Sequence, residues 1–335
     1  MATIEKEYLT SYDLSADFFR ELGVNVIDIV PLRKVFVLKT TEGNKILKKM
    51  NCDVDRINFI NWCINSLDNK NIIKFKIFDD KRCYKKWKDN NYVLMDVING
   101  REANFSNEVE YEMAIALIAD IHEKGKQILD LNIKNKKEDS LIEKYNKKIV
   151  SLKKIKEWVN EYEYKNEFDK TFLNNVNRYL INIEEAIDIL KCSDYEIDRE
   201  ANKKITICHN DLIEHNFLID NEKMSLIDFD YVTIDLRSMD IADIIVKGIK
   251  NSYFEYKKAK RAIDRYDAQN SLMDNEYKYI YAMITYPRDF VSIIENYYYK
   301  RKMWEYQTYI NRLNNKLELD KYRLEFLDEY KKEYL

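Results

Sequence analysis

Apolar side chains in the first hundred residues follow two different spacings. The runs 27–40 and 45–50 have the apolar patterning of β-strands. Gly43, in the connection between them, suits the positive φ of a hairpin turn. Residues 53–67 instead carry an apolar side chain every three or four positions, which is the spacing of one helix face. The pattern predicts two paired strands followed by a helix.

Shorter patterns surround these elements. Residues 13–22 have the spacing of a short amphipathic helix. Residues 72–78 and 92–95 are further strand candidates. Gly100 then interrupts the pattern, which indicates a boundary between two parts of the chain.

From residue 107 onward the apolar spacing is mainly helical. Helices are expected over 108–122, 142–162 and 168–190, and again from residue 240 to the end. Two short apolar strands interrupt this series, one directly before His209 and one over 224–227.

The two kinds of pattern divide the chain after residue 98. A smaller first domain, residues 1–98, is expected to combine an antiparallel sheet with helices. A larger second domain, residues 99–335, is expected to be mainly helical. This division predicts an α+β fold.

Composition limits the classes of function. The chain has 335 residues and a net charge of -3, and its charged residues are spread along it, so we expect no nucleic-acid partner. It has no apolar run of membrane-spanning length and its N-terminus lacks a signal core, so we expect an intracellular protein with no membrane partner. The five cysteines include no C-x-x-C pair, and Cys208 is expected to be a small buried side chain.

The candidate chemistry lies in residues 205–230, which read ITICHNDLIEHNFLIDNEKMSLIDFD. Asp211 follows the first apolar strand, Asn216 comes five residues later, and Asp228 follows the second strand. In phosphoryl-transfer enzymes one carboxylate orients the attacking hydroxyl, while an amide and another carboxylate hold Mg²⁺ on the nucleotide phosphates. Protein kinases use the same order. The alternative is an ordinary β-hairpin with polar ends, since Asp and Asn are common in turns.

The same residues carry a family resemblance. HNDLIEHN followed by LIDFDY resembles the aminoglycoside phosphotransferase and choline kinase superfamily. Residues 94–100 resemble the hinge segment of those enzymes, and residues 228–243 resemble the choline and ethanolamine kinase pattern. Residues 286–290, with the Tyr and basic residues beyond them, resemble the CotS-type spore coat branch. The similarity spans residues 25–330.

The resemblance implies a bilobal protein-kinase-like fold that binds ATP and Mg²⁺ between its lobes. It implies that Asp211 is the catalytic base and that Asn216 and Asp228 are the metal ligands. Lys48 fits the lysine that grips the nucleotide phosphates, with Ile46 facing the adenine. Lys49 competes with Lys48, but residues two apart on a strand share a face, which favours Lys48. The implied nucleotide-binding set is Ile46, Lys48, Met95, Asp96 and Ile98.

Further residues near the motif are supporting candidates. Asp230 is expected beside the metal or the substrate, and His209 directly precedes the loop. In the family pattern Asp235 and Arg237 flank the active cleft, where they orient the loop or touch substrate. Asp240 is expected to be a helix N-cap.

The chain departs from kinases in two features. It has no Gly-rich phosphate loop, because Gly43 is the only glycine between Ile27 and Lys48. The helix after Lys48 also lacks the Glu that pairs with the lysine in kinases. Asp53 and Asp55 are then either substitutes for this Glu or favourable charges at the helix N-terminus.

Three functional hypotheses follow. The first is an ATP- and Mg²⁺-dependent phosphotransferase of the CotS type that acts on a small-molecule hydroxyl in the cytoplasm of the mother cell. The second is a catalytically weak or inactive kinase-fold component of the spore coat, in contact with other coat proteins, which the 26 tyrosines suit through cross-linking. The third is a choline or ethanolamine kinase whose aromatic box includes Tyr231.

Overall fold

The computed structural model describes residues 14–32, 35–128, 139–201 and 205–335. The chain divides into two compact units. Unit 1 consists of residues 1–103 and 215–232, and unit 2 of residues 104–214 and 233–335. The hairpin that leads to Asp228 therefore belongs to the N-terminal unit, although in sequence it lies inside the C-terminal half.

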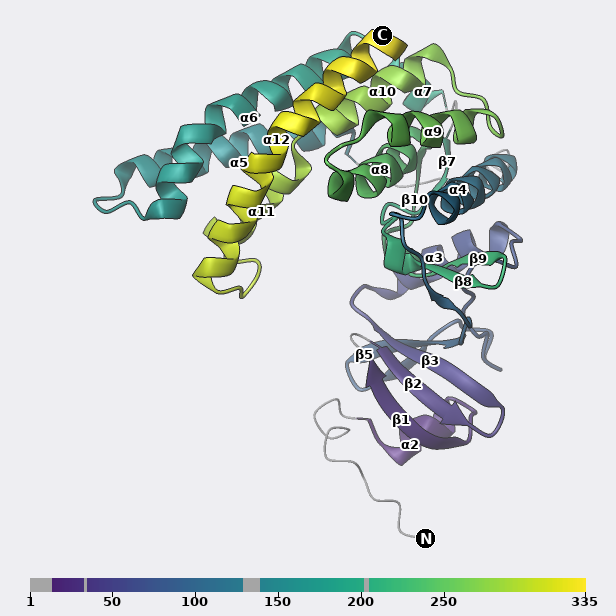
Figure 1. The fold of residues 1–335 in the computed structure, drawn as a ribbon. Coiled ribbons are helices and arrows are strands. Elements are labelled where there is room, and N and C mark those ends of the chain that lie inside the picture. Colours follow the sequence, from purple (N-terminus) through teal and green to yellow (C-terminus); the bar gives the residue numbers. More distant parts are fainter. Residues whose placement is uncertain (1–13, 33–34, 129–138, 202–204) are drawn as a thin grey trace. The chain divides into compact units, whose positions relative to one another are not determined.

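Unit 1 is built on a five-stranded antiparallel sheet in the order β1-β2-β3-β5-β4 (Figure 1). Its strands are β1 (Val26–Leu32), β2 (Val35–Thr40), β3 (Gly43–Met50), β4 (Lys85–Trp87) and β5 (Asn90–Asp96). Gly43 has φ +104° and pairs with Thr40, which confirms the predicted hairpin turn.

The prediction of a single strand over 27–40 was wrong. This segment forms two antiparallel strands, in which Leu32 pairs with Val35. Apolar side chains continue through both strands, so the apolar pattern alone did not mark the reversal.

The prediction of a strand over 72–78 was also wrong. The segment makes only isolated bridges, from Ile72 to Leu226 and from Phe75 to Met95. Four of its five apolar side chains are buried without a hydrogen-bonded ladder, and the edge beside β5 is occupied by β4 instead. A run of mostly buried apolar residues therefore has a strand-like sequence although the segment is irregular.

Two helices belong to unit 1, α2 (Ala16–Glu21) and α3 (Val54–Ser66), as the apolar spacing predicted. Phe18 of α2 lies in the core beneath the sheet, with its ring centroid 4.9 Å from that of Tyr92 and 5.2 Å from that of Trp87. Ser15 accepts a hydrogen bond from the Phe18 N–H and so begins α2.

A second, three-stranded sheet of unit 1 has the order β6-β8-β9, with β6 (Arg101–Glu102), β8 (Phe217–Asp220) and β9 (Lys223–Leu226). Gly100 is required where the chain enters β6. Its φ is +138°, and a Cβ at this position would lie 2.7 Å from the Ile219 carbonyl oxygen. The glycine therefore allows the chain after β5 to pass close to β8.

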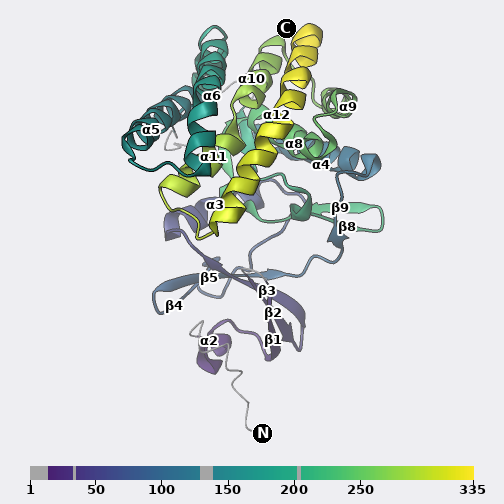
Figure 2. The same ribbon diagram turned by 60° about the vertical axis from the view of Figure 1, so that its left-hand side comes forward.

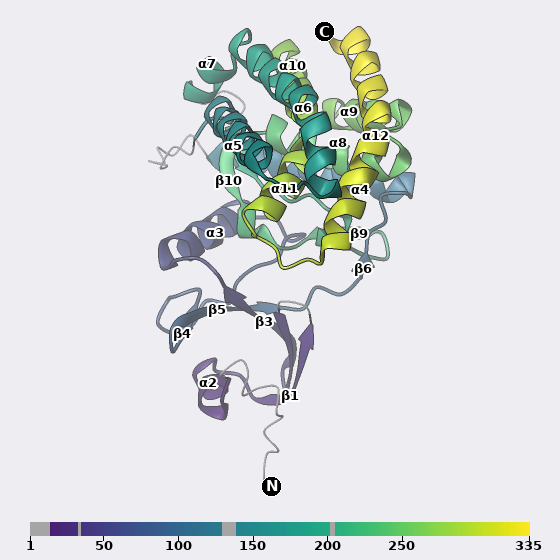
Figure 3. The ribbon, with the colours of Figure 1, turned by 90° about the vertical axis from the view of Figure 1, so that its left-hand side faces the viewer.

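Unit 2 is mainly helical, with one two-stranded antiparallel sheet of β7 (Ile205–Cys208) and β10 (Thr233–Leu236). Its helices are α4 (Glu108–Ile128), α5 (Leu141–Glu161), α6 (Glu167–Lys191), α7 (Tyr195–Glu200), α8 (Ser238–Ile249), α9 (Tyr256–Asp267), α10 (Asp274–Thr285), α11 (Arg288–Tyr298) and α12 (Tyr306–Tyr334). Helices α5 and α10 pack against α6, and the long α12 packs against α10 and α11 (Figures 2 and 3).

The helices predicted from the sequence over 108–122, 142–162 and 168–190 are confirmed as α4, α5 and α6. The starts of α5 and α6 are encoded by capping boxes. Ser140 caps α5 with Glu143 reaching back, and Asn166 caps α6 with Asp169 reaching back. The predicted α+β fold, with an antiparallel sheet in a smaller unit and a larger helical unit, is also confirmed. None of the described helices combines the length and apolar character needed to cross a membrane.

Candidate active site

The loop after β7 in unit 2 is held by hydrogen bonds to its backbone. The His209 N–H donates to Asp240 Oδ2 at 2.6 Å, and the Asn210 N–H donates to Asp240 Oδ1 at 2.7 Å. Asn210 has φ +63°, a left-handed conformation that turns the chain toward Asp211. Its amide donates to Thr233 Oγ1 at 2.7 Å, which ties the turn to β10.

Asp240 is not the N-cap of α8, so that prediction was wrong. The helix begins at Ser238, and Asp240 lies in its first turn, where its carboxylate is fully buried against the loop. His122 Nε2 lies 3.1 Å from Asp240 Oδ2, and Tyr266 Oη lies 2.7 Å from the other ring nitrogen of His122. Asp240 therefore stabilises the loop after β7 and does not cap the helix.

The charge of Asp240 is stabilised by these partners. Burial alone would raise the pKa of the carboxyl group, but the hydrogen bond and charge of His122, the charge of His209 and the loop N–H groups outweigh it. The pKa of Asp240 therefore lies below its usual value.

Asp211, the predicted base, lies beside a lysine of the same unit. Lys247 Nζ donates to Asp211 Oδ1 at 2.7 Å and lies 3.3 Å from Asp243 Oδ2. The side chain of Asp211 is 31% exposed, so its carboxylate is oriented by the lysine yet accessible from solvent. His209 Nδ1 accepts a hydrogen bond from the Asp211 N–H at 3.3 Å.

Asp243 fixes the next part of the loop. Its carboxylate accepts from the Leu212 N–H at 2.9 Å and from Arg288 Nη1 at 2.5 Å. Lys247, Asp243 and His122 were not identified as site residues from the sequence. A spacing of four residues between Asp243 and Lys247 was the available signal, because residues so spaced lie on one helix face.

The phosphate-binding candidate of unit 1 is Lys48 on β3. Its ammonium lies 2.5 Å from Asp228 Oδ1 and 2.7 Å from Asp230 Oδ1, and its side chain is only 12% exposed. Burial would lower the pKa of Lys48, but Asp230 and Asp228 outweigh burial and raise it. Lys49, the competing lysine, is exposed.

The helix after Lys48 supplies a cation rather than an acid to this cluster. Asp53 is the N-cap of α3, and its side chain accepts from the Arg56 N–H at 2.8 Å. Asp55 lies in the first turn of the same helix. The Arg56 guanidinium donates to the Asp230 carbonyl oxygen at 2.8 Å, which ties α3 to the segment after Asp228. The carboxylates that pair with Lys48 come from that segment and not from α3.

The two predicted metal ligands lie at the same end of the hairpin β8–β9. Asn216 directly precedes β8, is buried, and its carbonyl oxygen accepts from the Ile227 N–H at 2.9 Å. Asp228 follows Ile227 and has φ +66°, an uncommon left-handed conformation for an aspartate. Asp230 is two residues farther on and joins the group through Lys48.

The remaining nucleotide-binding candidates lie on neighbouring strands of unit 1. Ile46 on β3 pairs with Met95 on β5, and Met95 is buried. Asp96 is exposed, and Lys45 Nζ lies 2.5 Å from its Oδ1. Ile98 is half-buried in the segment that follows β5.

Arg237 and Asp235, both buried, have structural partners. Arg237 makes a forked pair with Glu276, at 2.6 and 2.7 Å, and donates to the Ser271 carbonyl oxygen at 2.5 Å. Asp235 accepts from the Leu236 N–H at 2.8 Å. Cys208, also buried, lies on β7 as expected, with Sγ 3.4 Å from the Asp235 carbonyl oxygen. These contacts account for Arg237 and Asp235 without a substrate.

The arrangement suits a divalent cation. The carboxylates of Asp228 and Asp230 already converge on one positive charge, the Lys48 ammonium, and oxygen donors are the ligands that Mg²⁺ prefers. In unit 2, Asp211 offers an oriented and accessible carboxylate of the kind that accepts a proton from a hydroxyl.

Comparisons with known proteins identify the family and the fold of the chain. The family described as "Spore coat putative kinase YutH" matches residues 45–330. Spore coat protein S of Bacillus subtilis (strain 168) is 23% identical over 304 residues, which cover 88% of this chain and 86% of that protein.

Solved structures of small-molecule kinases share the fold. An aminoglycoside phosphotransferase from Alicyclobacillus acidocaldarius superposes with a TM-score of 0.80 at 16% identity, covering 100% of this chain and 97% of that one. Spectinomycin phosphotransferase in complex with ADP and spectinomycin gives a TM-score of 0.64 at 15% identity, covering 93% and 98%. Choline kinase from Streptococcus pneumoniae gives 0.54 at 13% identity, covering 90% and 96%.

These matches confirm the protein-kinase-like fold and the resemblance to the CotS-type branch of the aminoglycoside phosphotransferase and choline kinase superfamily. The family match covers most of the chain, including every candidate site residue. The chain belongs to the spore coat putative kinase YutH family.

Proposed function

We propose that the protein is an ATP- and Mg²⁺-dependent phosphotransferase that acts on the hydroxyl of a small molecule. The observation that carries the proposal is the contact of one ammonium, that of Lys48, with the carboxylates of Asp228 and Asp230. Buried lysine and paired carboxylates at the end of a hairpin are the parts needed to bind nucleotide phosphates and their metal.

The nucleotide is assigned to unit 1. Lys48 exchanges its carboxylate partners for phosphate oxygens when ATP binds, and Ile46 and Met95 supply apolar surface for the adenine. The spectinomycin phosphotransferase of the same fold was solved with ADP, which supports a nucleotide.

Asp228, Asn216 and Asp230 are the residues that would hold Mg²⁺. When bound, the ion neutralises charge on the phosphates. The backbone brings these residues to one end of the hairpin. Asp228 adopts a left-handed conformation there, and the Ile227 N–H donates to the Asn216 carbonyl oxygen at the same end.

Asp211 is assigned as the general base. Lys247 orients its carboxylate and Asp240 holds the loop backbone around it. In the transfer, the acceptor oxygen forms a bond to the γ-phosphorus, the bond from that phosphorus to the ADP oxygen breaks, and the hydroxyl proton passes to Asp211.

The experiment is a Mg·ATP titration of the parent and the Asp211→Asn variant, paired with an ADP-release screen over amino alcohols, sugars and hydroxy acids. Asp211→Asn should leave ATP affinity unchanged and lower the transfer rate by roughly 10²–10⁴-fold. Equal loss of binding and transfer would make Asp211 a structural residue. Failure of the parent to bind Mg·ATP would refute the proposed function.

A second candidate is a kinase-fold component of the spore coat without catalysis. Among the described residues, no carboxylate from α3 pairs with Lys48, which favours this alternative. Exposed tyrosines such as Tyr164 and Tyr253 also favour it. Under this alternative the parent would show neither ATP binding nor ADP release, and the protein would act through contacts with other coat proteins. Deposition in the spore coat or retention in the mother cell is compatible with either candidate.

A further inference from the structure

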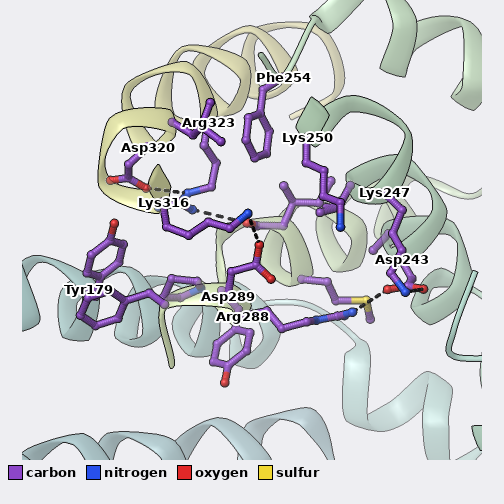
Figure 4. Close-up of a pocket in the computed structure, with 18 residues that line it drawn as sticks. Tyr179, Asp243, Lys247, Lys250, Phe254, Arg288, Asp289, Lys316, Asp320 and Arg323 are labelled. Carbon is purple, nitrogen blue, oxygen red and sulfur yellow. Dashed lines mark hydrogen bonds and ion pairs between the residues drawn. The ribbon is translucent and has the colours of Figure 1, made fainter. Parts of the chain in front are cut away.

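A pocket of about 100 Å³ lies within unit 2, next to the loop that carries Asp211. It is lined by α8, the short turn after α8, the end of α10, the start of α11, one face of α12 and Tyr179 of α6 (Figure 4). Apolar side chains such as Phe254, Met283 and Phe290 form part of its wall. Its size suits one small functional group, since drug-sized ligands occupy pockets of roughly 300–1,000 Å³.

The pocket is rich in positive charge. Five cationic side chains line it, and only three carboxylates accompany them. The cations are Lys247, Lys250, Arg288, Lys316 and Arg323, and the carboxylates are Asp243, Asp289 and Asp320.

Four of the five cations already have carboxylate partners. Lys316 Nζ lies 2.6 Å from Asp289 Oδ2, and Arg323 Nε lies 2.9 Å from Asp320 Oδ1. Arg288 pairs with Asp243, and Lys247 pairs with Asp243 and Asp211. Each carboxylate of the wall is therefore neutralised by a neighbour within the pocket.

Lys250 is the exception. Its half-buried side chain points into the pocket (Figure 4), and it makes no hydrogen bond or ion pair with any residue that the structure describes. Burial lowers the pKa of its ammonium, and Lys316 and Lys247 lower it further against the opposing effects of Asp289 and Asp243. A desolvated ammonium without a partner is costly, and a bound anion removes that cost.

Lys250 lies on the same helix end as the lysine that contacts Asp211, the predicted base. Lys250 follows Lys247 by three residues at the C-terminal end of α8, and Lys247 contacts the Asp211 carboxylate at 2.7 Å. Lys250 thus lines the same pocket as Lys247, the lysine that contacts the predicted base.

An amine or quaternary ammonium acceptor does not match this pocket. It would meet an excess of positive charge, and the wall carboxylates that could pair with it are already bound to lysine or arginine. The charge pattern therefore favours the opposite class of ligand.

We propose that this pocket binds an anionic group, a carboxylate or a phosphate, and that the acceptor is an alcohol that carries such a group. The acceptor role rests on the proposed phosphotransferase function, whereas anion binding at Lys250 does not.

The test is a calorimetric titration of the full chain with inorganic phosphate, acetate and choline chloride at constant ionic strength. The variants are Lys250→Met, the exposed control Lys257→Met on α9, and Lys48→Met, which removes the lysine of the proposed nucleotide site. At least one anion should bind the parent, and Lys250→Met should weaken that binding about tenfold or more, because a charge-assisted contact is lost. Lys257→Met and Lys48→Met should keep this component of binding. Comparing the phosphate titration with the acetate titration shows whether the pocket prefers a phosphate or a carboxylate.

Three results would overturn the inference: no binding of either anion, equal affinity in Lys250→Met and the parent, or binding of choline in their place. A Lys250→Glu variant keeps the test decisive, because reversing the charge should abolish anion binding while circular dichroism shows that the protein remains folded. The same samples are titrated with Mg·ATP. Anion binding that depends on Lys250 without ATP binding would refute the proposed function and leave the anion site standing, and the reverse result would refute only the anion site.

Discussion

At the scale of single residues, ion pairs orient the charged side chains of the candidate site in the absence of ligands. Lys48 is held by Asp228 and Asp230 in unit 1, and Asp211 is held by Lys247 in unit 2. Both lysines are mostly shielded from solvent, so their contacts are stronger than those of exposed pairs. Each carboxylate is therefore fixed in direction before a substrate arrives.

The choice between Lys48 and Lys49 has a direct test. Lys48→Ala should weaken Mg·ATP binding by about tenfold or more, because it removes a buried charge contact to the phosphates. Lys49→Ala should have little effect, since this side chain is exposed. Isothermal titration of both variants measures the difference. Greater damage from Lys49→Ala would show that the opposite face of β3 meets the nucleotide.

The lowered pKa of Asp240 predicts that the stability of the protein depends on pH. Its folded pKa lies below the usual value of 3.8, so its stabilising contribution is present above the unfolded pKa and is lost as pH falls through the lower folded one. Asp240→Asn should cost about 3 kcal/mol of unfolding free energy at pH 7, because His122 and the loop N–H groups lose a buried charged acceptor.

The measurement is urea unfolding of the parent and Asp240→Asn at pH 7 and below pH 4. The difference between the two proteins should shrink at the lower pH, where the parent carboxylate becomes protonated as well. Asp328→Asn, at an exposed position on α12, is the control and should match the parent at both pH values. A difference that grows at low pH would contradict the lowered pKa of Asp240.

At the scale of elements, α8 organises the loop of unit 2. Asp240, Asp243 and Lys247 project from its successive turns to the loop backbone and to Asp211. The strand β7 delivers this loop, and α4 packs directly against β7. Helix α4 approaches β7 closely at Gly125, where a Cβ would lie 2.9 Å from the Ile207 backbone nitrogen and even closer to Thr206.

Gly125→Ala should therefore destabilise the protein, although the same change in an open helix position adds about 1 kcal/mol of stability. The new methyl group would push α4 away from β7, at a cost of about 1–3 kcal/mol. Thermal unfolding of Gly125→Ala beside Lys126→Ala, a change at an exposed position of the same helix, measures the net effect. A higher unfolding temperature for Gly125→Ala would show that the contact relaxes freely.

At the scale of the whole molecule, local patterns were sufficient for the helices and for the order of the motif residues. Long apolar stripes and capping boxes are local signals, so α5 and α6 could be predicted within a residue or two. The structure has Asp211 after β7, Asn216 before β8 and Asp228 after β9, which is the order of elements that the sequence predicted, while the roles of these residues stay predictions.

Features that depend on distant partners could not be predicted in this way. The position of Asp240 suggested a helix cap, but its partners His209 and His122 come from other segments of the chain. The irregular segment 72–78 resembled a strand because most of its apolar residues are buried, whereas pairing in a β-ladder depends on which strand lies beside it. The division into units also follows contacts, since the 215–232 segment joins the N-terminal sheets.

The central claim is that Asp228 and its neighbours hold a metal-bound nucleotide. The most direct measurement is calorimetric titration of ATP with and without Mg²⁺ into the parent, Asp228→Ala, and Asp220→Ala, which changes an exposed carboxylate of the same hairpin. We predict Mg²⁺-dependent binding to the parent and to Asp220→Ala, and loss of the Mg²⁺-dependent binding in Asp228→Ala. Equal affinity of the parent and Asp228→Ala for Mg·ATP would contradict the account.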